Sequence, residues 1–344
     1  MMNTKLCFSL LFLSFVGWYC HAQTTTCGKT FVNPVYNKDF ADPTVIKGAD
    51  GYYYAYGTNT VLEEKNIHIQ VLKSKDLVNW SYMGDALPVK PKWADKDFWA
   101  PHVLYDAKQK TYYLYYSGES DLATGKCIGV ATSKSPAGPF IDKGQPLICG
   151  NGFINIDPMA FDDPKTGKKL LYWGSDSEGL KVQELSEDRL NFKQESTMKV
   201  LVNPNPNNDP ENYQKLVEGS WVTYHNEFYY LYYSGDNCCG ERAHYAVMVA
   251  RSKKAEGPFE TLAEGKKTLN SVILKRNKKW IAPGHNSVLT DDKGQEWMVY
   301  HAIDSKNPEV GRILLIDKIT YRKGWPLVNS GTPSTKTISK PNIK

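Results

Sequence analysis

The stretch TYYLYYSG at residues 111–118 decides the fold, because it returns as FYYLYYSG at 228–235 and, in looser form, three more times. The looser copies are GYYYAYGT at 51–58, KLLYWGS at 169–175 and EWMVYHA at 296–302. Successive copies begin roughly 60 residues apart, which exceeds one hairpin and matches one four-stranded repeat unit. Much of the chain's aromatic content, 22 Tyr among 344 residues, is gathered in these runs.

Each aromatic run is preceded by a short apolar strand and followed by two further predicted strands. The preceding strands end in turns rich in Asp, Gly, Lys or Asn, as in DPTVIKGADG and HNSVLTDDKG, so each pair is typical of a hairpin. A third strand follows each run, and the expected fourth strands are WSYMG, PFIDKG, FKQES, PFETL and WPLVN. The in-phase recurrence of TSKSPAGPF and ARSKKAEGPF disfavours a generic β-sandwich. The sequence therefore predicts an all-β, five-bladed β-propeller with four antiparallel strands per blade.

The amino terminus has the pattern of a secretory signal peptide. One Lys precedes a short apolar run and a small-residue exit, which predicts a leader over residues 1–22 with cleavage after Ala22. Cys20 follows Trp18 and Tyr19, which disfavours a lipid attachment site there. We expect a secreted or periplasmic protein without a membrane span, in which residues 23–344 form one catalytic domain.

The charge and cysteine content of the chain say little about its binding partners. The formal charge of +5 is spread along the chain without a long basic block, which disfavours nucleic-acid binding. We expect a monomer. The chain after the leader has an odd number of cysteines without zinc-site spacing, and their pairing stays open: Cys27, Cys127, Cys149, Cys238 and Cys239. The adjacent Cys238 and Cys239 could form a vicinal disulfide that stiffens a loop, or could be unpaired or separately paired.

The chemistry is expected where the first strands of the blades begin, because these strands line the axis of a propeller and their ends converge. Three of the five positions have a carboxylate, Asp42, Asp157 and Glu218. Taken singly, Asp before Pro or Glu before Gly is a common turn residue. Three like charges at one axial position would repel each other, and crowding raises the pKa of one of them. A protonated carboxyl group beside an ionised one is the equipment for cleaving a glycosidic bond.

The chain resembles glycoside hydrolase family 43 over essentially its whole mature length. The motifs that carry the resemblance are DFADPTVI, WAPHV, NIDPMAF, VEGSWV, APGHNSV with YHA, and GRILLIDKI with GWPLVNSGTPS. The resemblance implies an inverting hydrolase in which Asp42 is the general base, Glu218 the general acid and Asp157 the group that tunes and orients the acid. Inversion requires roughly 6.5–9.5 Å between base and acid to admit a water.

The same resemblance implies several binding residues. Arg312 matches an arginine of the sugar pocket, and Trp99 is expected either to stack on a sugar or to pack between blades. Trp173 and Trp221 are also expected to contact substrate. His285 matches a histidine that points at a channel ion, often calcium held through water, with a hydrogen-bonded core histidine as the alternative. His102 stands where the family usually has an acid, so the hydrogen bonding of the second blade should differ.

The leading substrate is a plant cell-wall polysaccharide or oligosaccharide with α-L-arabinofuranosyl bonds, because the APGHNSV, YHA and GWPLVN motifs resemble arabinan-acting members. No cofactor is required by this reading, and a structural calcium ion is the only one considered. A β-xylosidase or another exo-glycosidase of the family is the alternative. A xylosidase is less favoured, because xylosidases of the family commonly have an extra carboxy-terminal β-sandwich and this chain ends soon after its fifth blade. A non-catalytic carbohydrate-binding propeller and a glycoside phosphorylase are the further rivals. Exo or endo action stays open.

Overall fold

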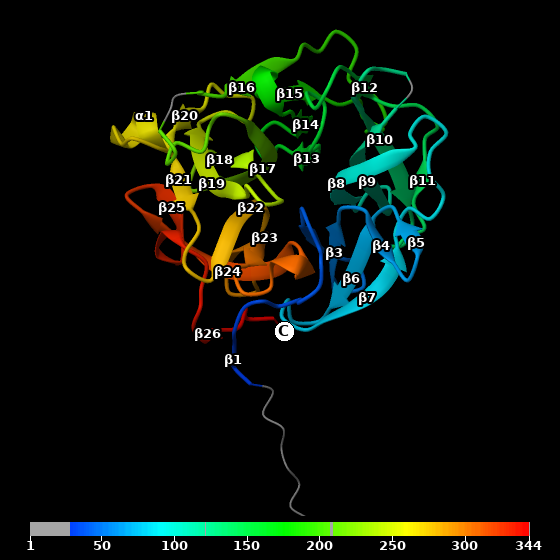
Figure 1. Ribbon diagram of the computed structural model, residues 1–344. Coiled ribbons are helices and arrows are strands. Elements are labelled where there is room, and N and C mark those ends of the chain that lie inside the picture. The colour runs from blue at the N-terminus through cyan, green and yellow to red at the C-terminus, as the bar shows by residue number, and fades with distance from the viewer. Residues whose placement is uncertain (1–27, 121, 207–208, 344) are drawn as a thin grey trace, which may run out of the picture.

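The computed structural model describes residues 28–120, 122–206 and 209–343. The predicted leader and Cys27 lie outside the described residues. Within them, strands form five main antiparallel sheets that follow one another around a central axis from the amino-terminal to the carboxy-terminal end (Figure 1). The predicted five-bladed β-propeller is confirmed.

Every blade runs in sequence order from an inner first strand to an outer fourth strand. Blade one consists of β2 (Thr44–Lys47), β3 (Tyr53–Gly57), β6 (Gln70–Ser74) and β7 (Trp80–Asp85). Blade two consists of β8 (Lys96–Asp106), β9 (Thr111–Glu119) and β10 (Lys126–Ser133), with β11 (Ile141–Asp142) and β12 (Ile148–Cys149) both paired to β10. Blade three consists of β13 (Met159–Asp162), β14 (Lys169–Trp173), β15 (Leu180–Glu184) and β16 (Lys199–Val202).

The last two blades repeat the pattern. Blade four consists of β17 (Val217–His225), β18 (Phe228–Asn237) and β19 (His244–Ser252), with β20 (Glu260–Thr261) and β21 (Val272–Leu274) both paired to β19. Blade five consists of β22 (Trp280–Thr290), β23 (Glu296–Asp304), β24 (Ile313–Arg322) and β25 (Trp325–Val328). The first strands also contact each other around the ring: β2 with β8 and β22, β13 with β8 and β17, and β17 with β22. The ends of the five first strands therefore meet at the axis.

The aromatic runs are the second strands, and they are buried on both faces. All five residues of β3 are buried, as are the first eight of the nine residues of β9. A second strand is flanked by two strands of its own sheet and covered by the neighbouring blades, so neither of its faces reaches water. One apolar cluster accordingly includes Tyr172 of blade three, Tyr230 of blade four and Tyr300 of blade five. Packing between blades thus explains why the runs are almost continuously apolar or aromatic rather than alternating.

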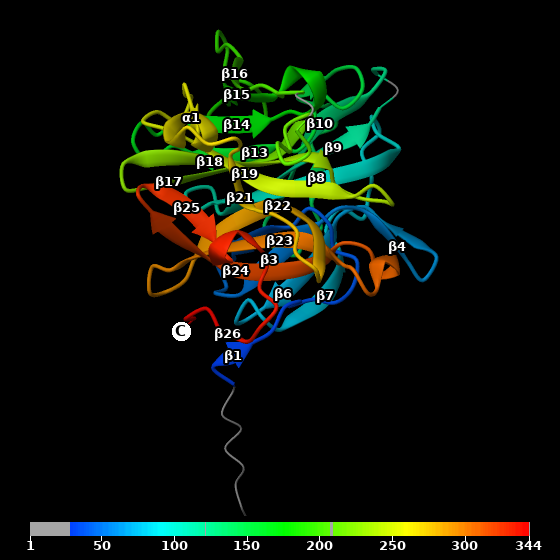
Figure 2. The same cartoon turned by 60° about the vertical axis from the view of Figure 1, so that its left-hand side comes forward.

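The ring is closed by the two ends of the described chain. The short strand β1 (Thr30–Phe31) pairs with β26 (Ile338–Ser339), beside the carboxy-terminal end in Figure 2. The segment after β1 lies along blade five, where the Phe40 amide donates to the carbonyl of Arg312 at 2.7 Å. This contact brings the start of blade one against the third strand of blade five.

The fourth strand of blade three differs from its prediction. FKQES was expected to form it, but the strand is β16, a few residues later. Phe192 instead makes an isolated bridge to Leu185, and its ring packs on Trp173 with 5.4 Å between centroids. The prediction was wrong because an apolar residue near the expected spacing serves packing here rather than the sheet edge.

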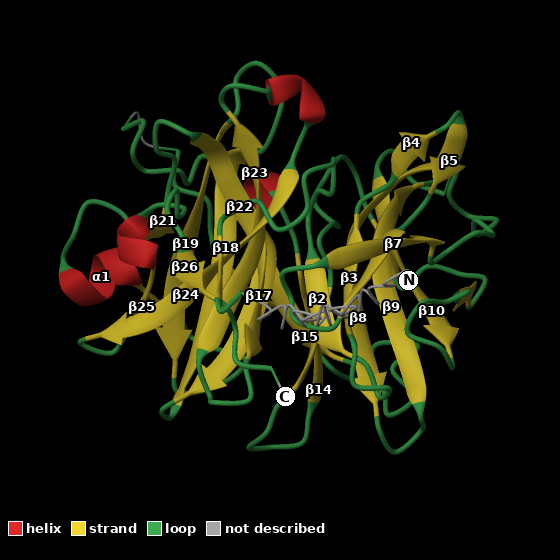
Figure 3. Ribbon diagram, turned by 90° about the horizontal axis from the view of Figure 1, so that it is seen from below, coloured by secondary structure: helices red, strands yellow, loops and turns green. Residues whose placement is uncertain are grey.

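Elements outside the blades are short. Between the second and third strands of blade one, β4 (Thr60–Leu62) and β5 (Lys65–Ile67) form a hairpin. The helix α1 (Leu262–Lys266) lies at the periphery (Figures 1 and 3), and single 3-10 turns occupy η1 (Asp176–Glu178), η2 (Pro308–Val310) and η3 (Asn329–Gly331). No helix in the described part of the chain is long and apolar enough to cross a membrane.

Candidate active site

A cavity of about 510 Å³ lies where the first strands of all five blades begin, and the three predicted carboxylates share it. Every blade contributes to its lining, which consists of Asp42, Thr58, Asn59, Trp99, Phe153, Ile156, Asp157, Ser175, Leu216, Glu218, Asp236, Asn237, Cys238, Cys239, His285 and Arg312. The sequence prediction that these carboxylates converge therefore agrees with the geometry of the fold.

The backbone around the carboxylates repeats from blade to blade. Asp42 and Asp157 each stand before a proline and have positive φ values of 55° and 58°. Aspartate is one of the few residues that accept this left-handed region, at a cost on the order of 1 kcal/mol. Gly219, directly after Glu218, has φ 64°, and a Cβ atom there would lie 3.3 Å from Nδ1 of His285. Glycine at 219 therefore gives both the turn and the close approach of blade five.

Asp42 is held as an ionised carboxylate. Arg312 donates from Nη1 to its Oδ1 at 2.8 Å, Thr58 donates from Oγ1 to its Oδ2 at 2.5 Å, and its own amide donates to Nδ1 of His301 at 3.1 Å. Burial alone would raise the pKa of Asp42, but Arg312 first, then His285 and His301, outweigh it and hold the pKa well below its usual value. Asp42 is therefore an acceptor for a proton at neutral pH, as a general base must be.

Glu218 has the opposite tendency. The Tyr245 hydroxyl donates to Oε1 at 2.7 Å and the Ser175 hydroxyl donates to Oε2 at 3.0 Å. Burial raises the pKa of Glu218, and these two hydrogen bonds, which stabilise the ionised form, offset only part of that rise. Glu218 is thus suited to donate a proton.

Asp157 lies beside Glu218 without being hydrogen-bonded to it. Its Oδ2 accepts from the amide of Gly219 at 2.9 Å, so it anchors the turn that follows Glu218. Burial raises the pKa of Asp157 well above its usual value, and the charges of Glu218 and Asp42 raise it further. Asp157 therefore tends toward its protonated form, and it holds the Gly219 turn in place without adding a second negative charge beside Glu218.

His285 lies between Asp42 and Asp157. Its Nδ1 lies 3.5 Å from Oδ1 of Asp42 and 3.7 Å from Oδ2 of Asp157, and its amide donates to Oγ of Ser234 at 2.9 Å. Burial lowers the pKa of His285, partly offset by Asp42. The imidazole ring therefore lies between two acidic groups in the cavity.

The calcium ion suggested for His285 does not fit direct coordination by these side chains. Calcium takes six to eight oxygen ligands. Within residues 28–343, as far as the structure describes them, no three His, Cys, Asp or Glu side chains gather as a metal site. Buried polar atoms without a protein partner do occur beside the axis, on Ser220, Asn286 and Ser287. Such atoms are suited to ordered water.

Trp99 is the one predicted tryptophan that lines the cavity. Its ring stacks on Phe153 with 6.0 Å between centroids and 16° between planes, and the Lys126 ammonium lies 4.6 Å from the Trp99 ring. Phe153 is 49% exposed. The two rings form an aromatic wall on the side of blades two and three, of the kind that stacks on sugar faces.

Trp173 and Trp221 do not line the cavity, contrary to expectation. Trp173 has no exposed surface, and its Nε1 donates to Oδ1 of Asn155 at 3.0 Å. Trp221 is 8% exposed and faces the ring of His102. The β17–β18 register shifts between Glu218 and Trp221, so spacing from the acid did not indicate where this side chain points.

His102 is a core residue of the second blade. Its side chain is buried, and burial lowers the pKa of His102 to about 3, with a backbone contact to Ala160 offsetting a little. Nδ1 has no hydrogen-bond partner among the described residues. His102 is thus a neutral core residue and does not supply the acid that usually stands there.

A set of supporting polar residues was not singled out from the sequence. Each comes within two positions of the last aromatic residue of a repeat, and the set is Thr58, Ser117, Ser175, Ser234 and His301. Each contacts the start of an inner strand; Ser117, for example, donates to the carbonyl of Trp99. The endings YGT, YSG, WGS, YSG and YHA were the available signal.

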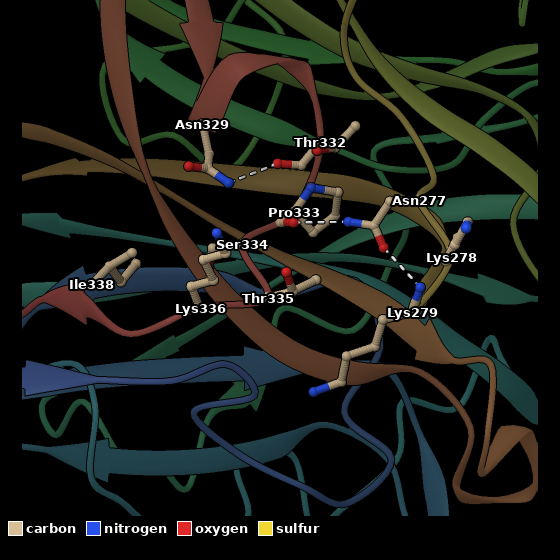
Figure 4. Close-up of a pocket in the computed structure, with 10 residues that line it drawn as sticks. All are labelled: Asn277, Lys278, Lys279, Asn329, Thr332, Pro333, Ser334, Thr335, Lys336 and Ile338. Atoms are coloured by element: carbon tan, nitrogen blue, oxygen red, sulfur yellow. Dashed lines mark hydrogen bonds between the residues drawn. The ribbon is translucent and has the colours of Figure 1, made fainter.

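A second hollow, of about 580 Å³, lies against the carboxy-terminal segment (Figure 4). Asn277 donates from Nδ2 to the carbonyl of Pro333 at 2.8 Å, and Lys278, Lys279 and Lys336 are on its wall. It has no carboxylate and shares no residue with the active-site cavity. Of these two hollows, only the axial cavity therefore has the carboxyl groups that acid and base chemistry needs.

Comparison with known proteins agrees with this geometry. The family model "Glycosyl hydrolases family 43" matches residues 31–326. The chain is 30% identical to the extracellular endo-α-(1→5)-L-arabinanase 1 of Bacillus subtilis, covering 84% of this chain and 88% of that protein. It is 28% identical to the extracellular exo-α-(1→5)-L-arabinofuranosidase of Cellvibrio japonicus, covering 85% and 86%.

A solved structure gives the same result. The crystal structure of a thermostable family-43 glycoside hydrolase superposes with a TM-score of 0.76 and 29% sequence identity, over 92% of this chain and all of that one. Fold, carboxylate constellation and sequence relatives thus agree. The chain belongs to glycosyl hydrolases family 43.

Proposed function

We propose that this protein cleaves α-L-arabinofuranosyl bonds in arabinan or in an arabinose-bearing plant polysaccharide, in a single inverting displacement. The observation that carries the proposal is the contrast between two carboxyl groups in one cavity, the low pKa of Asp42 and the raised pKa of Glu218. Such a contrast separates a base from an acid. The arabinan-directed names of the two sequence relatives favour arabinose over xylose.

The base side of the reaction is assigned to Asp42. Its carboxylate takes a proton from a water molecule, which attacks the anomeric carbon from the face opposite the leaving group. Arg312 donates to one carboxylate oxygen and Thr58 donates to the other, so the orientation of the carboxylate is fixed. The Arg312 guanidinium, 19% exposed, is also placed to hold sugar hydroxyl groups.

The acid side is assigned to Glu218, which protonates the leaving oxygen. Tyr245 and Ser175 hold its two oxygens, and Asp157 keeps the adjoining turn in place. After one turnover the proton taken by Asp42 returns to water, and Glu218 is reprotonated. Trp99 supplies the stacking wall for the bound sugar.

The remaining assignments follow from the same proposal. The leader over residues 1–22 directs secretion, residues 23–344 act as one catalytic domain, and the enzyme works as a monomer. Any calcium ion near His285 is held through water and takes no part in the displacement.

The test is a comparison of substrates. Purified enzyme should release arabinose or short arabino-oligosaccharides from sugar-beet arabinan faster than it releases xylose from xylo-oligosaccharides. Asp42→Asn protein purified in parallel controls for contaminating activity. Proton spectra of the first product should show the inverted anomer. Faster xylose release, or cleavage of a galactosyl substrate alone, would contradict the arabinan assignment, and a retained anomer would contradict the mechanism.

A further inference from the structure

The loop between β18 and β19 has two neighbouring cysteines that are bonded to each other. Cys238 and Cys239 form a disulfide, and both line the active-site cavity. Cys239 is exposed and Cys238 is partly buried. The vicinal pairing considered for this loop is therefore present, at a position where it faces the active-site cavity.

The buried end of this disulfide is attached to the wall behind the general acid. Cys238 packs on a small apolar cluster of Tyr245, Ala282 and Ile303. The Tyr245 hydroxyl donates to Glu218. The disulfide is thus fixed on its inner side, and its exposed sulfur is presented toward the cavity.

The position of the disulfide along a bound substrate follows from the role of Glu218. A general acid must lie within hydrogen-bond reach of the leaving oxygen. Glu218 and both cysteines belong to blade four, whereas Asp42 lies on blade one. The sugar that leaves is therefore on the side of the cavity where the disulfide lies.

The cavity shares part of its wall on that side with a neighbouring hollow. This hollow, of about 520 Å³, shares Leu216, Asp236 and Asn237 with the active-site cavity. Its wall includes His244, whose ring stacks on Tyr213 with 4.2 Å between centroids and 2° between planes. A chain extending beyond the leaving sugar would pass the disulfide to reach it.

We propose that the Cys238–Cys239 disulfide is a specificity-determining wall of the subsite for the leaving sugar. Sulfur is polarisable and weakly hydrogen bonding, so two bonded sulfurs offer a compact apolar surface to the C–H face of a furanose ring. The disulfide selects substrates that continue past the cleaved bond, without touching the reacting atoms. This inference rests on the proposed arabinan-cleaving function.

The experiment compares two substrates that differ only in the leaving group. Linear arabinotriose places a sugar against the disulfide, whereas α-L-arabinofuranosyl fluoride leaves that subsite empty. Replacing both cysteines by serine (Cys238→Ser with Cys239→Ser) should raise KM for arabinotriose about fivefold, a typical factor for loss of one small apolar contact. KM for the fluoride should stay within about twofold of the wild-type value, because no contact with that substrate is lost.

Two further variants separate this role from a structural one. The apolar pair Cys238→Ala with Cys239→Val should bring KM for arabinotriose part of the way back to the wild-type value. The matched control removes the other disulfide, Cys127–Cys149, which joins β10 to β12 in blade two and does not line the cavity. That control should lower Tm and leave the ratio of the two KM values unchanged.

The outcomes are distinct. Equal loss of kcat on both substrates would mean that the disulfide acts through Tyr245 and the acid, and would overturn the proposal. Free thiols at both positions, found by alkylation and peptide mass spectrometry of oxidised wild-type protein, would overturn it too. If the serine variant does not fold, the wild-type enzyme reduced with a phosphine replaces it in the same comparison. Wild-type protein inactive on every arabinoside would refute the proposed function instead.

Discussion

Replacing Arg312 by methionine should move the acid limb of the pH–rate profile to higher pH. The guanidinium Nη1 lies 2.8 Å from Oδ1 of Asp42, and the two side chains are only 19% and 9% exposed. A unit charge pair about 4 Å apart interacts by roughly 4 kcal/mol at an effective dielectric constant near 20. Such a pair lowers the pKa of an acid by about 1 to 3 units, each unit being about 1.4 kcal/mol. In Arg312→Met, the pKa of Asp42 should rise by about that amount, and the limb with it.

The same variant should change how stability depends on pH. In the wild type, the pKa of Asp42 is lower in the folded than in the unfolded protein, so its contribution is present above the unfolded value and is lost as pH falls. Without Arg312, the folded pKa of Asp42 rises by about 1 to 3 units, so the variant loses about 1.4 to 4 kcal/mol of stability near neutral pH relative to the wild type. This difference between variant and wild type shrinks as the pH falls and Asp42 binds a proton in both proteins.

The assay is kcat/KM across pH on one arabino-oligosaccharide, together with urea unfolding at several pH values. Arg312→Lys is the matched control, because it keeps the charge and loses the forked hydrogen bonds to a sugar. It should lose activity without moving the acid limb. If Arg312→Met has the wild-type limb and only a lower plateau, Arg312 acts on the sugar alone and the electrostatic reasoning is refuted.

Three further predictions concern the other side chains of the site. Glu218→Gln should abolish cleavage of polysaccharide yet retain activity on aryl arabinofuranosides, whose leaving groups need little protonation, whereas Asp42→Asn should fail on both; equal residual activity of the two on the aryl substrate would contradict the roles. Tyr245→Phe removes a hydrogen bond that lowers the pKa of Glu218, so the alkaline limb of kcat should shift upward by up to about one unit; a downward shift would count against this orientation. Trp99→Ala should raise KM about tenfold with little change in Tm, and Trp173→Phe should lower Tm with KM unchanged, so the reverse pattern in kinetics and thermal melts would be inconsistent with their positions.

The repeat was readable in the sequence because each blade solves the same packing problem. A strand covered on both faces must be almost entirely apolar or aromatic, and TYYLYYSG and FYYLYYSG have this composition. The Asp-Pro pairs at 42 and 157 were readable for a related reason, since equal positions in equal blades converge at the axis. The fourth strand of blade three could not be located from the sequence, because an edge strand has few packing constraints. Phe192 occurs at a spacing typical of a fourth strand but forms only an isolated bridge.

The sequence by itself determined the number of blades, the convergence of Asp42, Asp157 and Glu218, and the family resemblance, because all three follow from periodicity and local motifs. Only the tertiary structure decided which side chains touch. Arg312 and Asp42 are 270 positions apart and meet because the ring closes blade five onto blade one. Trp173 faces the core and Cys238 faces the cavity. Side-chain direction depends on register shifts, bulges and the neighbouring blade, and none of these is encoded by the local pattern of residue types.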